Sequence, residues 1–458
     1  MPAWSDRTMG WLCLATLGYC SGNTVGLESY MSRLPMAIDP DLPLQRFDPD
    51  RLPVVLMGGI TLVRTLGLAG IQAVVASPTP DDPVFASRYC TARCVLPPFD
   101  QGENTVDVLI ALGDRLAKAY GRRVPLMYGS DDALELIYRH RERLQRHFLV
   151  LLNDRAVGDA LIAKDRFQAL SKSRGLPIPQ ELAWEGPGHG TLAGTPGEVL
   201  IKPSIKVDWY GSLLRERLFP GDAKARVYPS GAAVLADPVV ALFREQLTFQ
   251  EYIPGDESCL YSFHGLADGQ GHVLTSFVGR KLRTYPPVDG ESAFIELAHD
   301  SSLTELGRQV AARLPLKGVF KMDFKRDPRD GRWYLLEINA RYNLWHYLGA
   351  ANGINLMRAS YDFLVDGAQW ESERYGTRLR WLSLGLDFAA YRELAAAGRL
   401  SLFAWLRSIL GSRNVYNVFA VGDPGPWLRF QSNRFTRRWD RGCALLVSAF
   451  RQWRSTAS

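Results

Sequence analysis

Residues 318–343, GVFKMDFKRDPRDGRWYLLEINARYN, are predicted to form two strands joined by a tight turn. Apolar and polar residues alternate over 320–325 and again over 333–339. The intervening DPRDG contains proline, aspartate and glycine, which are typical of turns. The stretch therefore predicts an antiparallel β-hairpin.

The register of this hairpin follows if Asp330 lies near the middle of the turn. Directly opposed residues point to the same side of a sheet, so one face is apolar and the other polar. The predicted cross-strand pairs are Asp323–Glu337, Phe324–Leu336 and Met322–Ile338. The apolar face comprises Phe320, Met322, Phe324, Tyr334, Leu336 and Ile338. The polar face comprises Lys321, Asp323, Lys325, Glu337 and Asn339.

The polar face gathers two carboxylates and an amide beside lysines. Oxygen ligands of this kind suit Mg²⁺ bound together with phosphate. A solvated hairpin face with cross-strand ion pairs would show the same pattern. The hairpin alone leaves both interpretations open.

Composition indicates a chain of two or three domains. It has 458 residues, of which 47% are hydrophobic, enough for a sizeable core. The 54 basic residues only slightly outnumber the 48 acidic ones, so the net charge of +6 does not indicate a nucleic-acid partner. The six cysteines form no CxxC pair, so reduced thiols in a cytoplasmic protein are expected. No run reaches the roughly 18 apolar residues of a membrane span.

The first domain is predicted to be α/β. The apolar segment LPVVLM at 52–57 is followed by two glycines, a helical pattern at 60–69 and a second apolar run at 71–76. This order is typical of nucleotide-binding domains with a parallel sheet. The absence of GxGxxG argues against a dinucleotide site. We expect one domain at 47–152, preceded by an extension at 1–46.

Three basic stretches follow that could bind anions. Lys164 lies in a predicted helix at 159–173, and Lys202 closes an apolar strand before a proline. GRKLR at 279–283 places three cations at one strand end. Between them, residues 204–226 are basic and glycine-punctuated, as in a flexible lid. An ordinary surface lysine or a solvated basic turn would look the same at each site.

The character of the chain changes after residue 371. Two helices are predicted, at 388–397 and 402–410. The last 32 residues hold seven arginines against one acid, Asp440, with aromatic residues among them. This composition fits either contact with an anionic surface or the solvated end of a helix.

Five segments, in this order, resemble the ATP-grasp superfamily, and most of all its carboxylate–amine ligase group, which includes D-aspartate ligase and relatives of carbamoyl-phosphate synthetase. They are KDRFQALSKSRGLPIP, VLIKP, FQEYIPGDE, GRKLRTYPP and FKMDFKRDPRDGRWYLLEINAR. The resemblance spans roughly residues 50–420. It implies a mixed α/β and α+β fold with a Rossmann-like domain first and a mostly helical extension last. It also implies a lysine and lid subdomain at 153–250, a metal-binding subdomain at 251–370 and the extension at 371–458.

The resemblance further implies an ATP site between two lobes. By their positions in the motifs, the phosphates would be contacted by Lys164 and Lys202. The adenine would be contacted by the side chain of Gln250 and the backbone of Glu251 and Ile253, and the ribose by Glu257. The ligands of Mg²⁺ or Mn²⁺ would be Asp323, Glu337 and Asn339. The transferred phosphate or the substrate carboxylate would be held by Arg341, with Arg280 or Arg283.

The chain departs from the family pattern at three places. Residues 206–209, KVDW, stand where many relatives have a glycine-rich phosphate loop. Asp323 stands where relatives often have glutamate, and ARYN at 340–343 replaces a commoner Pro-Arg-Phe pattern. Lid and substrate contacts are therefore not carried over.

The activity implied is that of an ATP-dependent ligase, joining a carboxylate to an amine through an acyl phosphate and releasing ADP and phosphate. The implied partners are ATP, a small carboxylate such as an amino acid, and an amine, with no nucleic acid; a homodimer is compatible with the family. Three alternatives remain from the sequence: a non-catalytic ATP-binding scaffold, an NAD-type oxidoreductase built on Gly58 and Gly59, and a membrane-surface protein acting through its arginine-rich end.

Overall fold

The computed structural model describes residues 42–436, apart from 187, 189, 205–211, 220–222, 224, 288–289, 369 and 371–373. The predicted N-terminal extension up to residue 41, the lid segment 205–211 and the arginines beyond 436 lie outside the described residues. The described residues from 43 to 436 belong to one compact unit, and the following concerns that unit. No helix among the described residues is long and apolar enough to cross a membrane.

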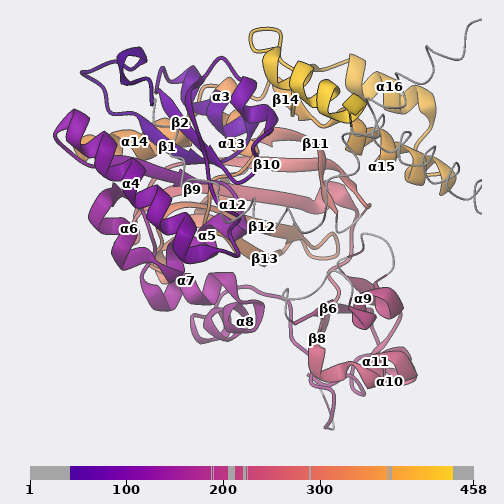
Figure 1. Cartoon of the computed structure of the whole chain (residues 1–458). Coiled ribbons are helices and arrows are strands. Elements are labelled where there is room, and N and C mark those ends of the chain that lie inside the picture. Colours follow the sequence, from indigo (N-terminus) through magenta and orange to yellow (C-terminus); the bar gives the residue numbers. More distant parts are fainter. Residues whose placement is uncertain are drawn as a thin grey trace, which may run out of the picture. The chain divides into compact units, whose positions relative to one another are not determined.

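The first module is built on a five-stranded parallel sheet with the order β3-β2-β1-β4-β5, of which Figure 1 labels β1 and β2. Every residue of β1, β2 and β4 is buried, as expected for parallel strands covered on both faces. The strand order is that of a doubly wound fold without its sixth strand, which confirms the parallel sheet predicted here. Its strands are β1 (Val54–Met57), β2 (Ala73–Ser77), β3 (Cys90–Val95), β4 (Val124–Tyr128) and β5 (Phe148–Leu149). Its helices are α3 (Ile60–Leu68), α4 (Gly102–Tyr120), α5 (Asp131–Arg139) and α6 (Arg141–His147).

Two helices, α7 (Arg155–Ile162) and α8 (Lys164–Ser173), stand where the sequence predicted one helix at 159–173. Ala163 between them adopts an extended backbone, with φ −102° and ψ 121°, which ends one helix and starts the next. The single-helix prediction is therefore wrong at this residue.

A three-stranded antiparallel sheet, β7-β6-β8, forms a smaller module with its own apolar core. Its strands are β6 (Val199–Pro203), β7 (Arg226–Tyr228) and β8 (Leu247–Glu251). Its short helices are α9 (Leu213–Leu218), α10 (Gly231–Leu235) and α11 (Pro238–Leu242), each begun by a serine or aspartate cap.

A seven-stranded sheet carries the hairpin, in the order β13-β12-β9-β10-β11-β14-β15. Its strands are β9 (Leu260–Asp268), β10 (Val273–Tyr285), β11 (Glu291–Ala298), β12 (Lys317–Arg326), β13 (Trp333–Asn339), β14 (Leu379–Leu382) and β15 (Arg413–Tyr416). All neighbours are antiparallel except β14 and β15.

Each face of this sheet packs on a different helix. On one face, Phe263 and Val278 share a core with Leu303 and Val310 of α12 (Ser301–Arg313). On the other, Phe277 and other apolar residues pack against α13 (Trp345–Ala351) and α14 (Leu356–Asp366). We call these the α12 face and the α13 face.

The region after residue 371 is less helical than predicted. The two expected helices are present as α15 (Leu384–Ala396) and α16 (Leu402–Leu410). However, β14 pairs with β11, and β15 pairs with β14 in parallel, so this region completes the central sheet. Strands of four residues whose partners lie far away in the chain leave little periodicity in the sequence.

A buried ion pair ties the end of this region to the first module. Arg64 in α3 donates from Nε to Oδ2 of Asp423 at 2.8 Å, and both side chains are nearly inaccessible. Ser87 Oγ and the Arg88 amide donate to the same carboxylate. Because each carboxylate oxygen is satisfied, the charge of Asp423 is tolerated in the interior.

Candidate active site

The hairpin has the predicted register where it carries the polar cluster. The observed pairs there are Asp323–Glu337 and Met322–Ile338, with Lys321 opposite Asn339. Asp323 and Glu337 therefore project from neighbouring strands on one face, which the sequence had predicted from the turn position alone.

Beyond this point the predicted register is wrong. A β-bulge lets Phe324 pair with Leu335, so Leu336 is an extra residue in β13. Leu335 is consequently the fully buried core residue, while Tyr334 and Leu336 are only partly buried. The extra residue reverses the alternation that the sequence analysis had assumed.

Asp323 lies buried at the base of the cluster. Its Oδ1 accepts a hydrogen bond from Ser262 Oγ, and its Oδ2 accepts one from Lys321 Nζ at 2.6 Å. Burial acts to raise the pKa of Asp323, but the ammonium groups of Lys321 and Lys281 outweigh it and lower the pKa well below its usual value. The carboxylate is therefore ionised at neutral pH.

Glu337 is exposed, in contrast to Asp323, and accepts a hydrogen bond from Asn339 Nδ2 at 3.1 Å. No cluster of three or more histidine, cysteine or acidic side chains suited to a metal occurs among the described residues. The cluster thus offers two carboxylates and an amide oxygen, all hard donors. Such a partial set fits Mg²⁺, which commonly completes its shell with water and phosphate oxygens.

Three further residues of this cluster were missed by the sequence analysis as site residues. Ser262 in β9 lies opposite Asp323, and Lys321 points along the α13 face towards the ring of Trp345, 5.8 Å from its centroid. Lys281 in β10 is close enough to lower the pKa of Asp323. The alternation of 258–266 was visible in the sequence, but not that this strand lies beside the hairpin.

Arg280 and Arg283 do not join the cluster, which corrects the predicted carboxylate clamp. Arg280 lies opposite Tyr261, on the α12 face, and binds Glu296. Arg283 is buried and donates from Nε and Nη2 to Asp387 at 2.6 and 3.0 Å. A bulge after Lys281 keeps Arg283 on the same face as Arg280, so only Lys281 of the three cations faces Asp323.

Arg341 connects the hairpin with the first module. Its guanidinium forms a bidentate pair with Asp131, the first residue of α5, at 2.6 and 3.2 Å. The neighbouring Tyr342 amide donates to the Tyr128 carbonyl at the end of β4. The residue predicted to hold a substrate anion thus already has a carboxylate partner.

The predicted nucleotide residues lie mainly in the smaller module and the segment after it. Lys202 in β6 lies opposite Thr248. Lys164 is the first residue of α8, and its side chain is not among those that the structure describes. Gln250 and Ile253 are buried. The Glu251 amide donates to the Gln180 carbonyl at 2.9 Å, so a contact of its backbone with adenine would use the carbonyl.

Glu257 lies beside a buried lysine at the start of the seven-stranded sheet. It accepts a hydrogen bond from Arg399 at 3.4 Å. Lys325 lies over the ring of Tyr252, 4.5 Å from its centroid. Burial lowers the pKa of Lys325, while nearby acidic groups, Glu257 among them, partly counter this effect. The structure thus joins the predicted ribose-binding residue to the hairpin strand β12.

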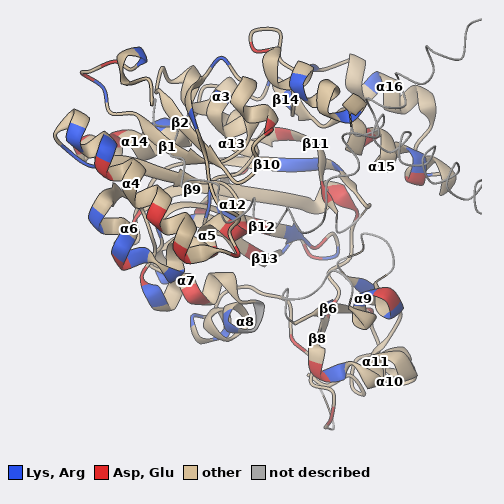
Figure 2. Cartoon of the chain, in the orientation of Figure 1, with Lys and Arg blue, Asp and Glu red and all other residues tan. Residues whose placement is uncertain are grey.

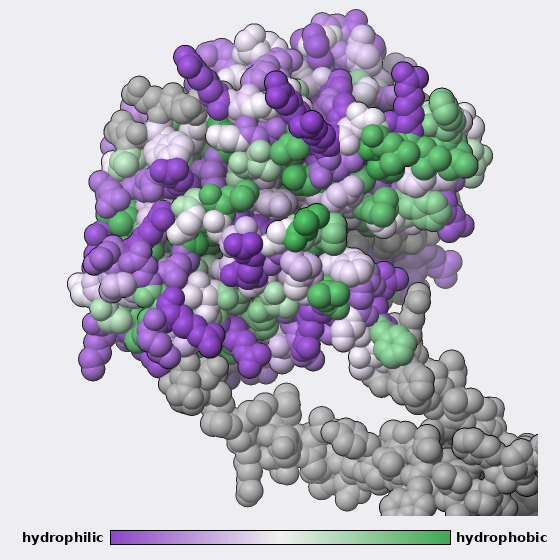
Figure 3. Space-filling view, turned by 90° about the horizontal axis from the view of Figure 1, so that it is seen from above, coloured by the Kyte–Doolittle hydropathy of each residue, from purple (hydrophilic) through white to green (hydrophobic). Residues whose placement is uncertain are grey.

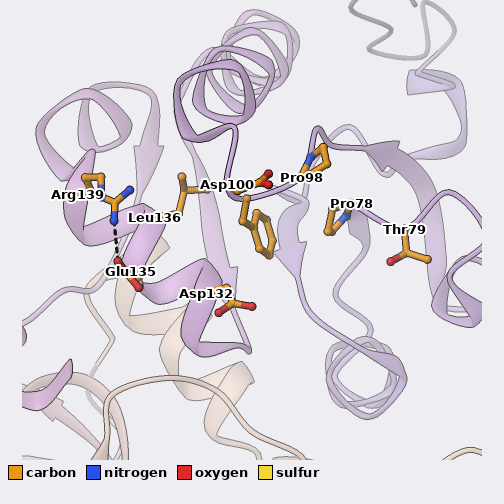
Figure 4. A pocket seen from close by; sticks show the side chains of 9 residues that line it. Pro78, Thr79, Pro98, Asp100, Asp132, Glu135, Leu136 and Arg139 are labelled. Atoms are coloured by element: carbon orange, nitrogen blue, oxygen red, sulfur yellow. Dashed lines mark hydrogen bonds and ion pairs between the residues drawn. The ribbon is translucent and has the colours of Figure 1, made fainter. Parts of the chain in front are cut away.

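A cavity of about 500 Å³ opens at the carboxyl edge of the five-stranded sheet (Figure 4). Asp132 on its wall directly follows Asp131, the partner of Arg341. Glu135 on the wall is paired with Arg139 at 2.6 Å. The carboxyl edge is where open parallel sheets bind ligands. The lining residues are Pro78, Thr79, Pro98, Phe99, Asp100, Asp132, Glu135, Leu136 and Arg139.

Comparisons with known proteins agree on the fold. No protein-family model matches the chain. It is 23% identical to D-aspartate ligase of Enterococcus faecium (strain Aus0004) over 304 residues, which are 62% of this chain and 68% of that protein. The crystal structure of a biotin carboxylase–β,γ-ATP complex from Campylobacter jejuni matches with a TM-score of 0.50 at 14% identity, over 72% of this chain and 74% of that one. The structure of N5-carboxyaminoimidazole synthetase from Staphylococcus aureus matches with a TM-score of 0.51 at 13% identity, over 71% and 80% of the two chains.

Proposed function

We propose that this chain, a homologue of D-aspartate ligase with the ATP-grasp fold, is an ATP-dependent ligase that joins a carboxylate to an amine. The resemblance and the fold class predicted from the sequence are confirmed. The observation that carries the proposal is the pairing of Asp323 with Glu337 on one face, with two lysines around the buried carboxylate. A solvated hairpin face would not bury one of its acids.

Asp323, Glu337 and Asn339 would hold Mg²⁺ or Mn²⁺. When bound, the metal would neutralise part of the charge on the ATP phosphates. Ser262 and Lys321 fix the orientation of Asp323 through its two oxygens, so this ligand is positioned before ATP arrives. Glu337, being exposed, is the ligand that solvent and nucleotide reach first.

The first step would transfer the γ-phosphoryl group to the substrate carboxylate. A carboxylate oxygen attacks the γ-phosphorus, the bond to the β-phosphate oxygen breaks, and ADP leaves. Such transfers depend mainly on positioning and charge neutralisation. Lys202 and Lys164 would contact the phosphates, and Lys281 would take the carboxylate-binding role first expected of Arg280 and Arg283.

The second step would form the amide bond. A neutral amine attacks the acyl carbon, and phosphate leaves with the bonding electrons. We place the amine substrate in the cavity beside α5, because Asp100 and Asp132 on its wall favour a cationic group before it loses its proton. Arg341, held by Asp131, would lie between this cavity and the hairpin cluster.

The nucleotide would bind along the end of β8. Adenine would be contacted by Gln250, the Glu251 carbonyl and Ile253, and the ribose by Glu257. The ribose hydroxyls would then compete with Arg399 for the Glu257 carboxylate. We retain the predicted divisions at 1–46, 47–152 and 153–250 as part of this proposal, and we extend the metal-binding subdomain at 251–370 by β14 and β15 of the predicted extension at 371–458.

ADP release by the purified full-length chain tests the proposal. ATP and Mg²⁺ are supplied with a panel of amino acids and small carboxylates, each with and without an added amine. Release that requires both a carboxylate and an amine is expected. Formation of AMP would overturn the acyl-phosphate route, and ATP binding without turnover for every pair tested would favour a non-catalytic scaffold.

A further inference from the structure

Helix α16 and the segment after β15 turn large apolar side chains outward. Phe403 and Leu410 of α16 are 76% and 79% exposed, and Val421 is 86% exposed. In Figure 3, hydrophobic residues gather on the right of the view, over the part of the molecule where Figure 1 labels α15 and α16. We call these residues the C-terminal apolar face: Leu402, Phe403, Leu406, Leu410, Val421, Trp427 and Leu428.

The orientation of α16 is fixed by one buried residue. Trp405 donates from Nε1 to Asp387 Oδ2 at 2.8 Å and stacks on Tyr391, with ring centroids 4.8 Å apart. Asp387 is itself paired with buried Arg283. Because Trp405 points inward, Phe403 two residues before it and Leu410 five residues after it lie on the opposite side of the helix and point to solvent.

Basic residues outnumber acidic ones around the C-terminal apolar face, where the exposed Asp81 of the first module pairs with Arg429. Arg407, Arg413 and Arg434 are exposed, whereas Asp423, the one described acid between 398 and 436, is buried with Arg64. Figure 2 shows basic residues predominating over α16 and the helix at 425–436. The nearest exposed acid before this region, Glu393 in α15, directly follows the exposed Arg392.

We propose that the C-terminal apolar face docks on the surface of an anionic lipid membrane. Aliphatic and aromatic side chains would enter the boundary between headgroups and acyl chains, and the arginines would contact lipid phosphates. A second copy fits less well, because a two-fold interface would bring the same arginines together. Single-stranded nucleic acid fits less well, because base stacking needs aromatic platforms, and two of the three most exposed residues, Val421 and Leu410, are aliphatic.

This inference is independent of the proposed ligase activity. The C-terminal apolar face shares no residue with the hairpin cluster or the cavity, so membrane binding would place the protein at a surface without altering its chemistry. Failure of either proposal leaves the other standing.

Co-sedimentation of the full-length chain with vesicles tests the inference. Vesicles of phosphatidylcholine with about one third phosphatidylglycerol are compared with pure phosphatidylcholine at about 0.1 M salt. We expect binding to the anionic vesicles that is at least about tenfold stronger than to the neutral ones, because several cations contribute. Equal binding to both, or no binding, would overturn the proposal.

Substitutions test whether the C-terminal apolar face makes the contact with lipid. The double variant Phe403→Ser and Leu410→Ser should weaken binding at least about tenfold, since two large apolar groups are removed. The matched control is Leu213→Ser with Leu242→Ser, which removes two other exposed leucines and should leave binding unchanged. Arg407→Gln and Arg413→Gln should each weaken binding about fivefold.

Two readouts distinguish a lost lipid contact from unfolding and from a change in oligomeric state. The thermal midpoint and ADP release of the Phe403→Ser, Leu410→Ser variant should match the parent; if the midpoint falls, the single Leu410→Ser variant takes its place. Light scattering without vesicles should give the same mass for parent and variant. Parent dimers that dissociate in the variant would identify a second copy as the occupant and overturn membrane docking.

Discussion

The two faces of the seven-stranded sheet use similar charged residues for different purposes. On the α12 face, Arg280 shares Glu296 with Arg380, and Arg283 is paired with buried Asp387. On the α13 face, lysines surround the buried Asp323, while its cross-strand neighbour Glu337 is exposed. The first arrangement is closed and suits stability. The second leaves an exposed carboxylate beside an ionised buried one, which suits binding of a metal and phosphate.

The largest effect expected on the closed face follows from Asp387→Ala. The substitution leaves Arg283 buried without its counter-charge and removes the acceptor of Trp405 Nε1. Loss of one partner of a buried pair typically costs about 3–5 kcal/mol of unfolding free energy. Chemical denaturation measures this change.

Asp81→Ala is the control for that variant, since Asp81 pairs with Arg429 at an exposed site and its removal should cost about 0–1 kcal/mol. Below its unfolding transition, Asp387→Ala should retain ADP release. A variant as stable as the parent would show that the pair on the α12 face does not stabilise the fold.

Glu337→Gln should have the largest effect on turnover. It keeps the side-chain shape but removes the exposed charge of the cluster, and loss of one transition-state contact typically lowers the rate about 100-fold or more. The thermal midpoint should not fall, because Glu337 is exposed. Near-normal ADP release by the folded variant would exclude Glu337 as a metal ligand.

Lys281→Met and Arg280→Met compare the two faces directly, since these residues are neighbours on β10. Lys281 lies within electrostatic reach of Asp323, whereas Arg280 binds Glu296 on the opposite face. We expect kcat/KM to fall about 100-fold for Lys281→Met and less than about threefold for Arg280→Met. Equal losses in the two variants would mean that the two faces do not differ in function.

Strand alternation explains how far the sequence alone could go. It was sufficient for the Asp323–Glu337 pair, because a hairpin register depends on local turn chemistry. It failed one residue later at Leu336, and again at 281–283, because a β-bulge inserts a residue without a clear sequence pattern. In GRKLR at 279–283, the sequence therefore did not determine which of the three cations face the hairpin cluster. The sequence analysis selected the two arginines, which lie on the α12 face.

Non-local pairing accounts for most of the remaining differences. Ser262 could not be assigned to the site without knowing that β9 lies beside β12, and β14 and β15 could not be recognised without their partners. Elements defined by local periodicity were predicted well, as α16 and β13 show, since the predicted ranges 402–410 and 333–339 match the observed ones. The charge partners of Arg283, Arg341 and Asp423 depend on contacts over 100 residues or more and left no trace in the sequence pattern.

Acid should destabilise the α13 face through a buried histidine. Burial lowers the pKa of His346 to about 3, from an ordinary value of 6.5. Below pH 6.5 the unfolded chain therefore binds a proton that the native chain excludes, so stability falls as the pH decreases towards 3. Linkage gives a loss of about 1.4 kcal/mol by pH 5.5.

His346→Phe isolates this contribution. The free energy of unfolding is measured from pH 7 to 5 for parent and variant, and the parent should lose about 1.4 kcal/mol more by pH 5.5. His264, whose pKa is lowered mainly by burial and also by the neighbouring His346, remains in both proteins. Parallel pH profiles would show that His346 does not remain neutral in the native state.

The smallest effect expected is at the cavity, where Asp132→Asn should raise the KM for the amine about three- to fivefold with little change in kcat. Asp132 is exposed, and a charge in contact with solvent contributes at most about 1 kcal/mol. The effect should shrink as salt increases, because salt screens exposed charges, and the KM for ATP should not change.

Asp114→Asn is the control. It removes an exposed acid of α4 that is paired with His147, and it should leave kcat and every KM unchanged. If Asp132→Asn instead raised the KM for ATP or for the carboxylate, the cavity would belong to another substrate, and the division of roles between the first module and the hairpin would have to be redrawn.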